Sequence, residues 1–295
     1  TAEFYMARCL QLAKNGFGKV APNPMVGSVI VCDGKIIGEG YHQKCGEAHA
    51  EVNAIASVLD QSLLKHSTIY VNLEPCSHHG KTPPCADLII EKGIPEVVIG
   101  STDPHALVNG TGVDRLRKAG IKVQTGVLEK ECDALNKRFF TFHQKQRPYL
   151  ILKWAQSKDG FIDKERNEGE QGVNWITAPS TKKITHLWRS QEAAILVGTN
   201  TALIDNPELS TRAVAGKNPI RVLIDRELKV PSDNLIFNDA SETLVFNAKQ
   251  GTETESIIHI KIDFEANVLE QLLTELHQRN IQSLIVEGGA HTLAS

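Results

Sequence analysis

The chain has 295 residues, enough for about two domains of ordinary size. Hydrophobic residues make up 41% of it and charged residues 23%, as in soluble globular proteins, and no apolar run is long enough to cross a membrane. The net charge of −3, without any block of Lys or Arg, argues against a broad nucleic-acid-binding surface. Six cysteines with no signal-peptide layout near the N-terminus predict a reducing compartment, and so a cytoplasmic protein.

The first half of the chain alternates predicted strands with predicted helices. Apolar runs bounded by turn residues predict strands, and apolar residues three and four apart predict helices. This alternation predicts an α/β domain with helices on both faces of a sheet. In chain order, the expected elements are an amphipathic N-terminal helix, a strand over 25–32 with a turn at 33–35, a helix over 49–60, a strand over 68–73, a helix over 84–92, a strand over 96–101, a helix over 112–119 and a strand over 121–126.

A change in composition divides the chain near residue 145. All six cysteines lie within the first 132 residues, whereas all three tryptophans follow residue 150. The polar stretch 143–148 ends in a proline, which would interrupt a preceding helix, so we expect domains over 1–145 and 146–295. The second domain is also expected to be α/β, with a helix marked by leucines at 269, 272, 273 and 276 and with strands over 149–155, 193–197, 220–225, 243–246 and 283–287.

Two segments, GEAHAEVNAI and EPCSHHGKTPPC, contain residues that together predict a metal centre. His49 and Glu51 stand two apart at the start of a predicted helix, and Cys76 and Cys85 each follow a proline. An imidazole and two thiolates suit zinc and leave a fourth position for water, which zinc activates near neutral pH. The order His-x-Glu, Pro-Cys and Cys is that of the zinc deaminases, so we expect Glu51 to be the catalytic proton carrier.

Other interpretations of these residues are a structural zinc, a redox pair and a plain turn. His78 or His79 could complete a closed four-ligand shell, which would suit a zinc-stabilised binding module. A redox pair is disfavoured because its usual spacing is Cys-x-x-Cys, whereas eight residues separate the two cysteines here. The intervening loop also contains Lys81, a group suited to a phosphate-bearing substrate. A zinc deaminase of another base, nucleoside or RNA is the alternative activity.

The segments APNPMVGSVIV, HAE and EPCSHHGKTPPC closely resemble the bifunctional deaminase/reductase family of bacterial riboflavin biosynthesis. The resemblance runs along essentially the whole chain. It implies a cytidine-deaminase-like domain followed by a dihydrofolate-reductase-like domain. It also implies Zn²⁺ and NADPH as cofactors, a homo-oligomer, and 2,5-diamino-6-(5-phosphoribosylamino)pyrimidin-4(3H)-one as the substrate. In such a family the first domain removes a ring amino group and the second reduces the ribosyl group to ribityl.

The same resemblance assigns further site residues. In the first domain it places Asn23 and His42 near the substrate, beside Lys81, which the loop itself offers as a substrate contact. In the second domain, LKWAQSKDG resembles a family segment and marks Lys153 as a further catalytic candidate. The substrate positions there are Arg189, Leu209, Arg212 and Glu287, and the cofactor positions are Ala155, Trp175, Thr201, Asp205, Gly288 and Gly289.

Without the family resemblance, the residues of the second domain indicate its chemistry less specifically than those of the first. It has no G-x-G-x-x-G segment, so a Rossmann cofactor domain is not supported. Gly288 and Gly289 follow a predicted strand, where a glycine pair either cradles a phosphate or forms a turn. Arg189 and Arg212 could clamp a phosphate or form surface ion pairs.

Two positions depart from the family pattern. Val173 stands where the family commonly has serine, and Lys158 replaces a residue that is usually apolar. Relatives also continue through further strands beyond the position of Ser295, so a shortened reductase domain is expected.

Overall fold

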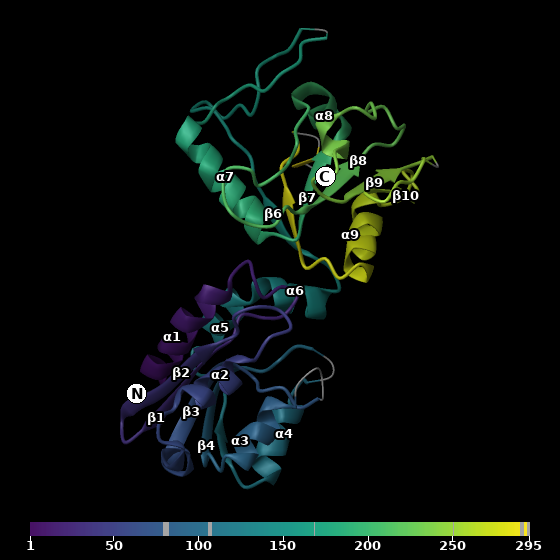
Figure 1. Cartoon of the computed structure of the whole chain (residues 1–295). Coiled ribbons are helices and arrows are strands. Elements are labelled where there is room, and N and C mark those ends of the chain that lie inside the picture. Colours follow the sequence, from purple (N-terminus) through teal and green to yellow (C-terminus); the bar gives the residue numbers. More distant parts are fainter. Residues whose placement is uncertain (79–82, 106–107, 168, 250, 290–291, 294–295) are drawn as a thin grey trace. The chain divides into compact units, whose positions relative to one another are not determined.

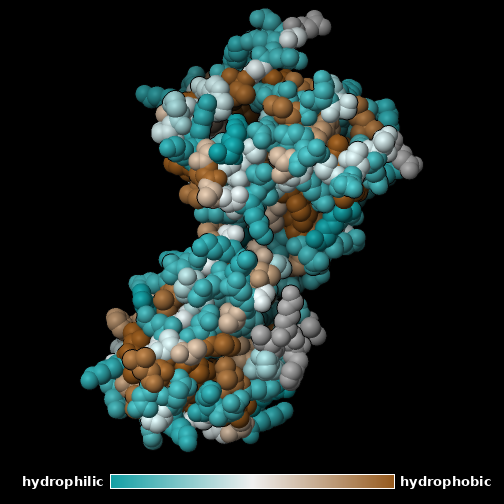
Figure 2. Space-filling model, in the orientation of Figure 1, coloured by the Kyte–Doolittle hydropathy of each residue, from teal (hydrophilic) through white to brown (hydrophobic). Residues whose placement is uncertain are grey.

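The computed structural model describes residues 1–295 except 79–82, 106–107, 168, 250, 290–291 and 294–295 (Figure 1). Contacts within the chain divide it into two units, Thr1–Lys145 and Gln146–Ser295. Polar side chains cover much of the visible surface of each unit, between smaller apolar areas (Figure 2). Among the described residues, no helix combines the length and the apolar character that a membrane crossing needs.

A mixed five-stranded sheet forms the centre of the first unit, in the order β2-β1-β3-β4-β5 (Figure 1). β1 pairs antiparallel with β2 and β3, whereas β3, β4 and β5 run parallel. The predicted turn between the first two strands is present: Asp33 and Gly34 both have positive φ, as a tight two-residue hairpin requires. The strands are β1 (Gly27–Cys32), β2 (Lys35–Tyr41), β3 (Ser67–Leu73), β4 (Glu96–Ser101) and β5 (Lys122–Gln124).

Helices cover both faces of this sheet, as the alternating sequence predicts. On one face, Met6, Cys9 and Leu12 of α1 pack with Cys132 of α5 against alternate residues of β1, β3 and β4. On the other face, α2, α3 and α4 pack against the intervening residues of the same strands. The helices are α1 (Ala2–Ala13), α2 (Ala50–Ser57), α3 (Cys85–Glu91), α4 (Thr111–Lys118), α5 (Glu129–Leu135) and α6 (Lys137–Lys145), with short 3-10 turns at Lys14–Gly16 and Gln61–His66.

Two glycines of β2 bring α2 into direct contact with the sheet backbone. A Cβ at Gly40 would lie 2.3 Å from the Ala54 nitrogen and 2.6 Å from the Ala50 carbonyl oxygen. A Cβ at Gly38 would lie 2.6 Å from the Ala54 carbonyl oxygen. Any other residue at these positions would push the helix away, so the height of α2 above the sheet is set by main-chain contact.

The second unit contains a six-stranded parallel sheet in the order β10-β9-β8-β7-β11-β6 (Figure 1). The first predicted strand ends earlier than expected, at Leu152, so Lys153 and Ala155 lie in the segment that follows it. The edge strand β10 was not predicted, although Ile258, Ile260 and Ile262 alternate with His259 and Lys261 and pack against one core cluster. The strands are β6 (Tyr149–Leu152), β7 (Ala194–Gly198), β8 (Ile220–Ile224), β9 (Thr243–Asn247), β10 (Ile257–Lys261) and β11 (Ser283–Val286).

Helices also pack on both faces of the second sheet. The predicted leucine-rich helix is present as α9 (Val268–Gln278), and its leucines at 272, 273 and 276 are buried against β7, β8, β9 and β11. Ala202 of α8 (Thr199–Asp205) packs on the opposite face with Leu209 and Ile236. The remaining helices are α7 (Pro179–Gln191) and a 3-10 turn at Leu235–Phe237.

A fully buried arginine on β8 ties a loop to the second sheet. The guanidinium of Arg221 donates from Nη1 to the carbonyl oxygens of Ile236 and Asn238, at 2.9 and 2.8 Å, and from Nη2 to the Asn238 side chain. Burial lowers the pKa of Arg221. The buried charge is therefore compensated largely by carbonyl dipoles.

We expect Arg221→Met to lower the free energy of unfolding of the second unit by about 3 kcal/mol, because buried carbonyl groups lose their donor. Urea unfolding followed by tryptophan fluorescence measures this unit, since all three tryptophans lie in it. Arg279→Met is the matched control: Arg279 pairs with Glu275 one helical turn away on α9, nearer the solvent, and its loss is expected to cost under about 1 kcal/mol. Equal effects of the two substitutions would contradict the prediction.

Candidate active sites

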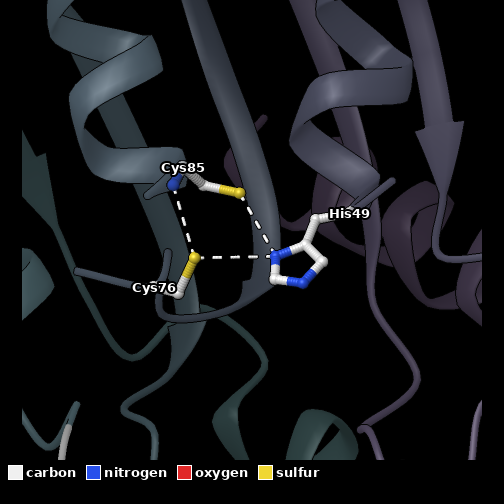
Figure 3. Close-up of side chains that lie close together, drawn as sticks. All are labelled: His49, Cys76 and Cys85. Atoms are coloured by element: carbon white, nitrogen blue, oxygen red, sulfur yellow. Dashed lines mark hydrogen bonds between the residues drawn. The ribbon is translucent and has the colours of Figure 1, made fainter. Parts of the chain in front are cut away.

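The predicted zinc ligands come from three segments that meet at one end of the first sheet (Figure 3). His49 occupies the N-cap position of α2, and Cys85 is the first residue of α3. Cys76 lies three residues after β3 rather than at a helix start, but its Sγ accepts the Cys85 backbone N–H at 3.3 Å. The helix start therefore faces the sulfur of Cys76, where its N–H groups favour a thiolate.

The three side chains are close enough to share one metal ion. Nδ1 of His49 lies 3.5 Å from Sγ of Cys76 and 3.4 Å from Sγ of Cys85. A tetrahedral zinc would separate a nitrogen and a sulfur ligand by about 3.5 Å, given Zn–N and Zn–S bonds of roughly 2.0 and 2.3 Å. Among the residues that the structure describes, these three form the one group of this kind. Their spacing and their chemistry fit zinc.

Hydrogen bonds among the three donor groups favour a thiolate at Cys76. The Cys85 thiol donates to Cys76, and with His49 and the Cys85 N–H it lowers the pKa of Cys76 to about 4. The same hydrogen bond and burial raise the pKa of Cys85 well above its usual value. The hydrogen bond to Cys76 raises the pKa of His49 to about 9. The hydrogen bonds within the ligand group therefore favour the thiolate at Cys76, the form in which a cysteine binds a metal ion.

Glu51 lies in the first turn of α2, one residue beyond the helix start, and is 3% exposed. Burial, with the nearby charge of Cys76, raises its pKa to about 7. A carboxyl group with such a pKa can both accept and release a proton near neutral pH. Its place beside the three ligands therefore suits proton transfer during hydrolysis.

Asn23 and His42 lie together beside the ligands. Nδ1 of His42 is 3.0 Å from the Ala48 carbonyl oxygen, and its Nε2 is 3.1 Å from Nδ2 of Asn23. Because a carbonyl can only accept, Nδ1 carries the proton, and Nε2 of the neutral ring accepts from Asn23. Burial lowers the pKa of His42, in agreement with a neutral ring. The His42 ring also meets the His49 ring edge to face, 5.5 Å between centroids.

Two buried asparagines that sequence reasoning missed hold the segment after Asn23. Oδ1 of Asn72 accepts from the Gly27 N–H at 2.7 Å, and Oδ1 of Asn136 accepts from the Met25 N–H at 2.8 Å. Both amides also donate to the Met25 carbonyl oxygen. The signal for Asn72 was present in the sequence, since an asparagine interrupts the apolar strand TIYVNL.

The loop between the cysteines is only partly described. Lys81 and His79 lie outside the described residues. His78 is exposed and stacks on His105 at 6.4 Å between ring centroids. It is absent from the metal-ligand group formed by the described residues, so it does not act as a fourth ligand there.

In the second unit, Lys153, Arg189 and Glu287 form one charged cluster. The guanidinium of Arg189 donates to both oxygens of Glu287, from Nε at 2.9 Å and from Nη2 at 2.8 Å. Nζ of Lys153 lies 3.4 Å from the same carboxylate. Despite burial, these cations lower the pKa of Glu287. Arg189 is thus held in place by Glu287, and its predicted contact with substrate stays a prediction.

We expect Glu287→Gln to lower the free energy of unfolding of the second unit by about 3 kcal/mol. The Arg189 side chain is 12% exposed, so the substitution leaves a mostly buried cation without its anion. Tryptophan-monitored urea unfolding measures the loss, and Glu275→Gln, which removes a more exposed helical ion pair, is the control. A change of under 1 kcal/mol for Glu287→Gln would show that solvent reaches Arg189 freely.

Two of the predicted substrate residues lie beside this cluster. The Ser210 carbonyl oxygen accepts from His186 Nδ1 at 2.7 Å and from Arg189 Nη1 at 3.3 Å. Leu209, just before it, is buried with a positive φ of 56°. Arg212 is more exposed and donates to Glu208 and to the Ser210 hydroxyl. Sequence reasoning missed His186, a buried residue one turn before Arg189 on α7.

The predicted cofactor residues occupy several segments of the second unit. The Gly289 N–H donates to the Thr201 hydroxyl at 3.1 Å, which joins the glycine pair to α8. Gly288 packs against Thr292, and burial raises the pKa of Asp205 at the end of α8. Trp175 is 60% exposed, with the Lys182 ammonium 3.6 Å from its ring centroid. Ala155 is partly exposed after β6.

Comparison with known proteins matches each unit to a family. Residues 1–101 match the cytidine and deoxycytidylate deaminase zinc-binding region, and residues 148–295 match the RibD C-terminal domain. The riboflavin biosynthesis protein RibD of Aquifex aeolicus is 42% identical over 99% of this chain and 82% of its own. The RibD of Escherichia coli is 38% identical over 97% and 81%.

A solved structure agrees with both units. The diaminohydroxyphosphoribosylaminopyrimidine deaminase/5-amino-6-(5-phosphoribosylamino)uracil reductase of Thermotoga maritima superimposes with a TM-score of 0.87 at 41% identity. The match covers 99% of this chain and 82% of that one. The expected pair of α/β domains is thereby confirmed. The chain belongs to the RibD family of riboflavin biosynthesis and is a bifunctional enzyme with a zinc-binding deaminase unit and a reductase unit.

Proposed function

We propose that the first unit removes the ring amino group of 2,5-diamino-6-(5-phosphoribosylamino)pyrimidin-4(3H)-one, with zinc held by His49, Cys76 and Cys85. The observation that supports this most directly is the convergence of three ligand atoms beside the buried Glu51. The Thermotoga maritima relative, 41% identical, is described as acting on a diaminohydroxyphosphoribosylaminopyrimidine. Among the described residues three ligand atoms converge, which leaves one position open, as a hydrolytic site needs and a structural site does not.

When bound, zinc supplies Lewis acidity that makes a water molecule nucleophilic near neutral pH. Hydrolytic deamination replaces the ring amino group by oxygen from water and releases ammonia, so protons must move from the water to the ring nitrogen and to the leaving amine. Glu51 accepts and returns these protons, which its pKa of about 7 permits. Asn23 and His42 are hydrogen-bonded to each other beside the zinc ligands, and they orient the pyrimidine.

We propose that the second unit then reduces the ribosyl group to ribityl with NADPH. When bound, NADPH would supply the hydride that reduces C1 of the sugar, and the ring oxygen would take up a proton as the ring opens. Lys153 lies in the segment after β6 with its ammonium beside Glu287, where it can supply a proton or stabilise charge. We assign the cofactor to Thr201 and the glycine pair, which share a hydrogen bond, together with Ala155, Trp175 and Asp205.

A homo-oligomer is proposed as well. Large apolar side chains of the second unit are exposed, including Trp154, Trp188 and Leu152, each at 44% or more. A second copy that covers them would remove this area from water. Light scattering coupled to size-exclusion chromatography measures the mass, and a monomer at micromolar concentration would contradict the proposal.

A coupled assay with the phosphoribosylaminopyrimidine and NADPH tests both activities. We expect ammonia release together with loss of nicotinamide absorbance. Ammonia release without NADPH oxidation would remove the reductase assignment alone. If zinc-loaded protein releases no ammonia from this compound but does so from another base or nucleoside, the substrate assignment is wrong and the zinc deaminase assignment stands.

A further inference from the structure

Glu74 is a buried glutamate, 4% exposed, between the end of β3 and the zinc ligand Cys76. Its carboxylate accepts four backbone N–H groups. Oε2 accepts from Asp103 at 3.1 Å and from Gly110 at 3.0 Å. Oε1 accepts from Gly112 at 2.9 Å and from Val113 at 3.1 Å. Four such bonds offset the cost of burying the carboxylate.

Two of these N–H groups belong to the first turn of α4, which has no side-chain cap of its own. The first N–H groups of a helix have no partner within it, so a carboxylate supplied by another segment caps this one. Glu74 thus joins the end of β3 to the start of α4.

The segment on the other side of Cys76 is joined to the same helix start. Oγ of Ser77 lies 2.5 Å from Oγ1 of Thr111, the first residue of α4. A Cβ at Gly112 would lie 2.2 Å from the Pro75 carbonyl oxygen, so the two main chains touch directly. Cys76 is therefore flanked by contacts to α4 at residues 74, 75 and 77.

We propose that Glu74 is a positioning residue for the zinc centre, which holds Cys76 at the distance from His49 and Cys85 that one metal ion needs. The carboxylate touches no ligand atom and acts through the backbone of residues 74–77. The proposal rests on the zinc site of the proposed function. A glutamine at this position would turn an N–H₂ donor toward two of the N–H groups, and the start of α4 would move away from Cys76.

The test is the zinc affinity of the whole chain, measured by competition with a chromophoric chelator. We expect Glu74→Gln to lower the affinity by about 10- to 100-fold, as for other groups that orient metal ligands. The absorption bands of the cobalt(II)-loaded variant should also shift, because they report ligand geometry. Glu39→Gln is the matched control, since Glu39 is a partly buried strand glutamate of the same sheet, paired with Arg8 away from the centre.

Unchanged zinc affinity and cobalt spectrum in folded Glu74→Gln would overturn the proposal, even if its melting temperature fell. If this variant does not fold, Ser77→Ala, which removes one contact on the other side of Cys76, decides: a several-fold weaker affinity supports positioning from α4, and an unchanged affinity overturns it. Wild-type protein that binds no zinc would instead refute the proposed function.

Discussion

Glu51→Gln is expected to lower the rate of ammonia release by about 10²- to 10⁴-fold, the range for loss of a general acid–base group. The amide keeps the size of the side chain but cannot accept the proton of the attacking water. Burial of Glu51 means that no bulk-solvent base can take its place. The measurement is steady-state ammonia release by zinc-loaded protein.

The control for this prediction is zinc content, which should match that of the wild type because Glu51 is not among the three ligands. Glu47→Gln removes an exposed glutamate just before α2 and should leave the rate unchanged. A Glu51→Gln enzyme with full zinc and more than a tenth of the wild-type rate would exclude Glu51 as the proton carrier.

Cys85→Ser is expected to weaken zinc binding by at least about 100-fold and to abolish ammonia release at ordinary zinc concentrations. A four-ligand zinc site binds with roughly 10–16 kcal/mol, so one ligand contributes roughly 3 kcal/mol. The serine hydroxyl has nearly the same size but does not ionise to replace the thiolate. Chelator competition measures the affinity.

Cys45→Ser is the matched control, because Cys45 is exposed and free and lies outside the ligand group. Excess zinc should restore part of the activity of Cys85→Ser if the defect is affinity alone. Wild-type zinc affinity in Cys85→Ser would mean that the metal is held by other residues.

Much of the first unit could be predicted from the sequence because its signals are local. The apolar run before Asp33 predicts β1, and the spacing after His49 predicts α2, which ends three residues earlier than expected. The ligand set was predicted because residue type and order alone indicate the chemistry. The pairing of Asn23 with His42 could not be derived from the residues themselves, since nineteen positions separate them and only the fold brings them together.

Two features of the second unit were not predicted from the sequence. The substrate contact of Arg189 stays a prediction, but its ion pair with Glu287, 98 residues away in sequence, was not predicted. The residue type alone does not tell whether the partner of an arginine is a phosphate or a carboxylate of the same chain. The edge strand β10 was missed although its sequence carries a signal, since isoleucines at 258, 260 and 262 alternate with His259 and Lys261 as in a half-buried strand.

The glycines of β2 determine which substitutions near the catalytic centre the protein can tolerate. Because α2 rests on main-chain atoms at Gly38 and Gly40, the position of His49 and Glu51 does not depend on the volumes of the surrounding apolar side chains. Ile55 can therefore be exchanged for a residue of similar size without displacing the catalytic centre, whereas the Val58 side chain packs directly on Gly38. Gly38 and Gly40 themselves should not tolerate even alanine, because its Cβ would collide with the backbone of α2.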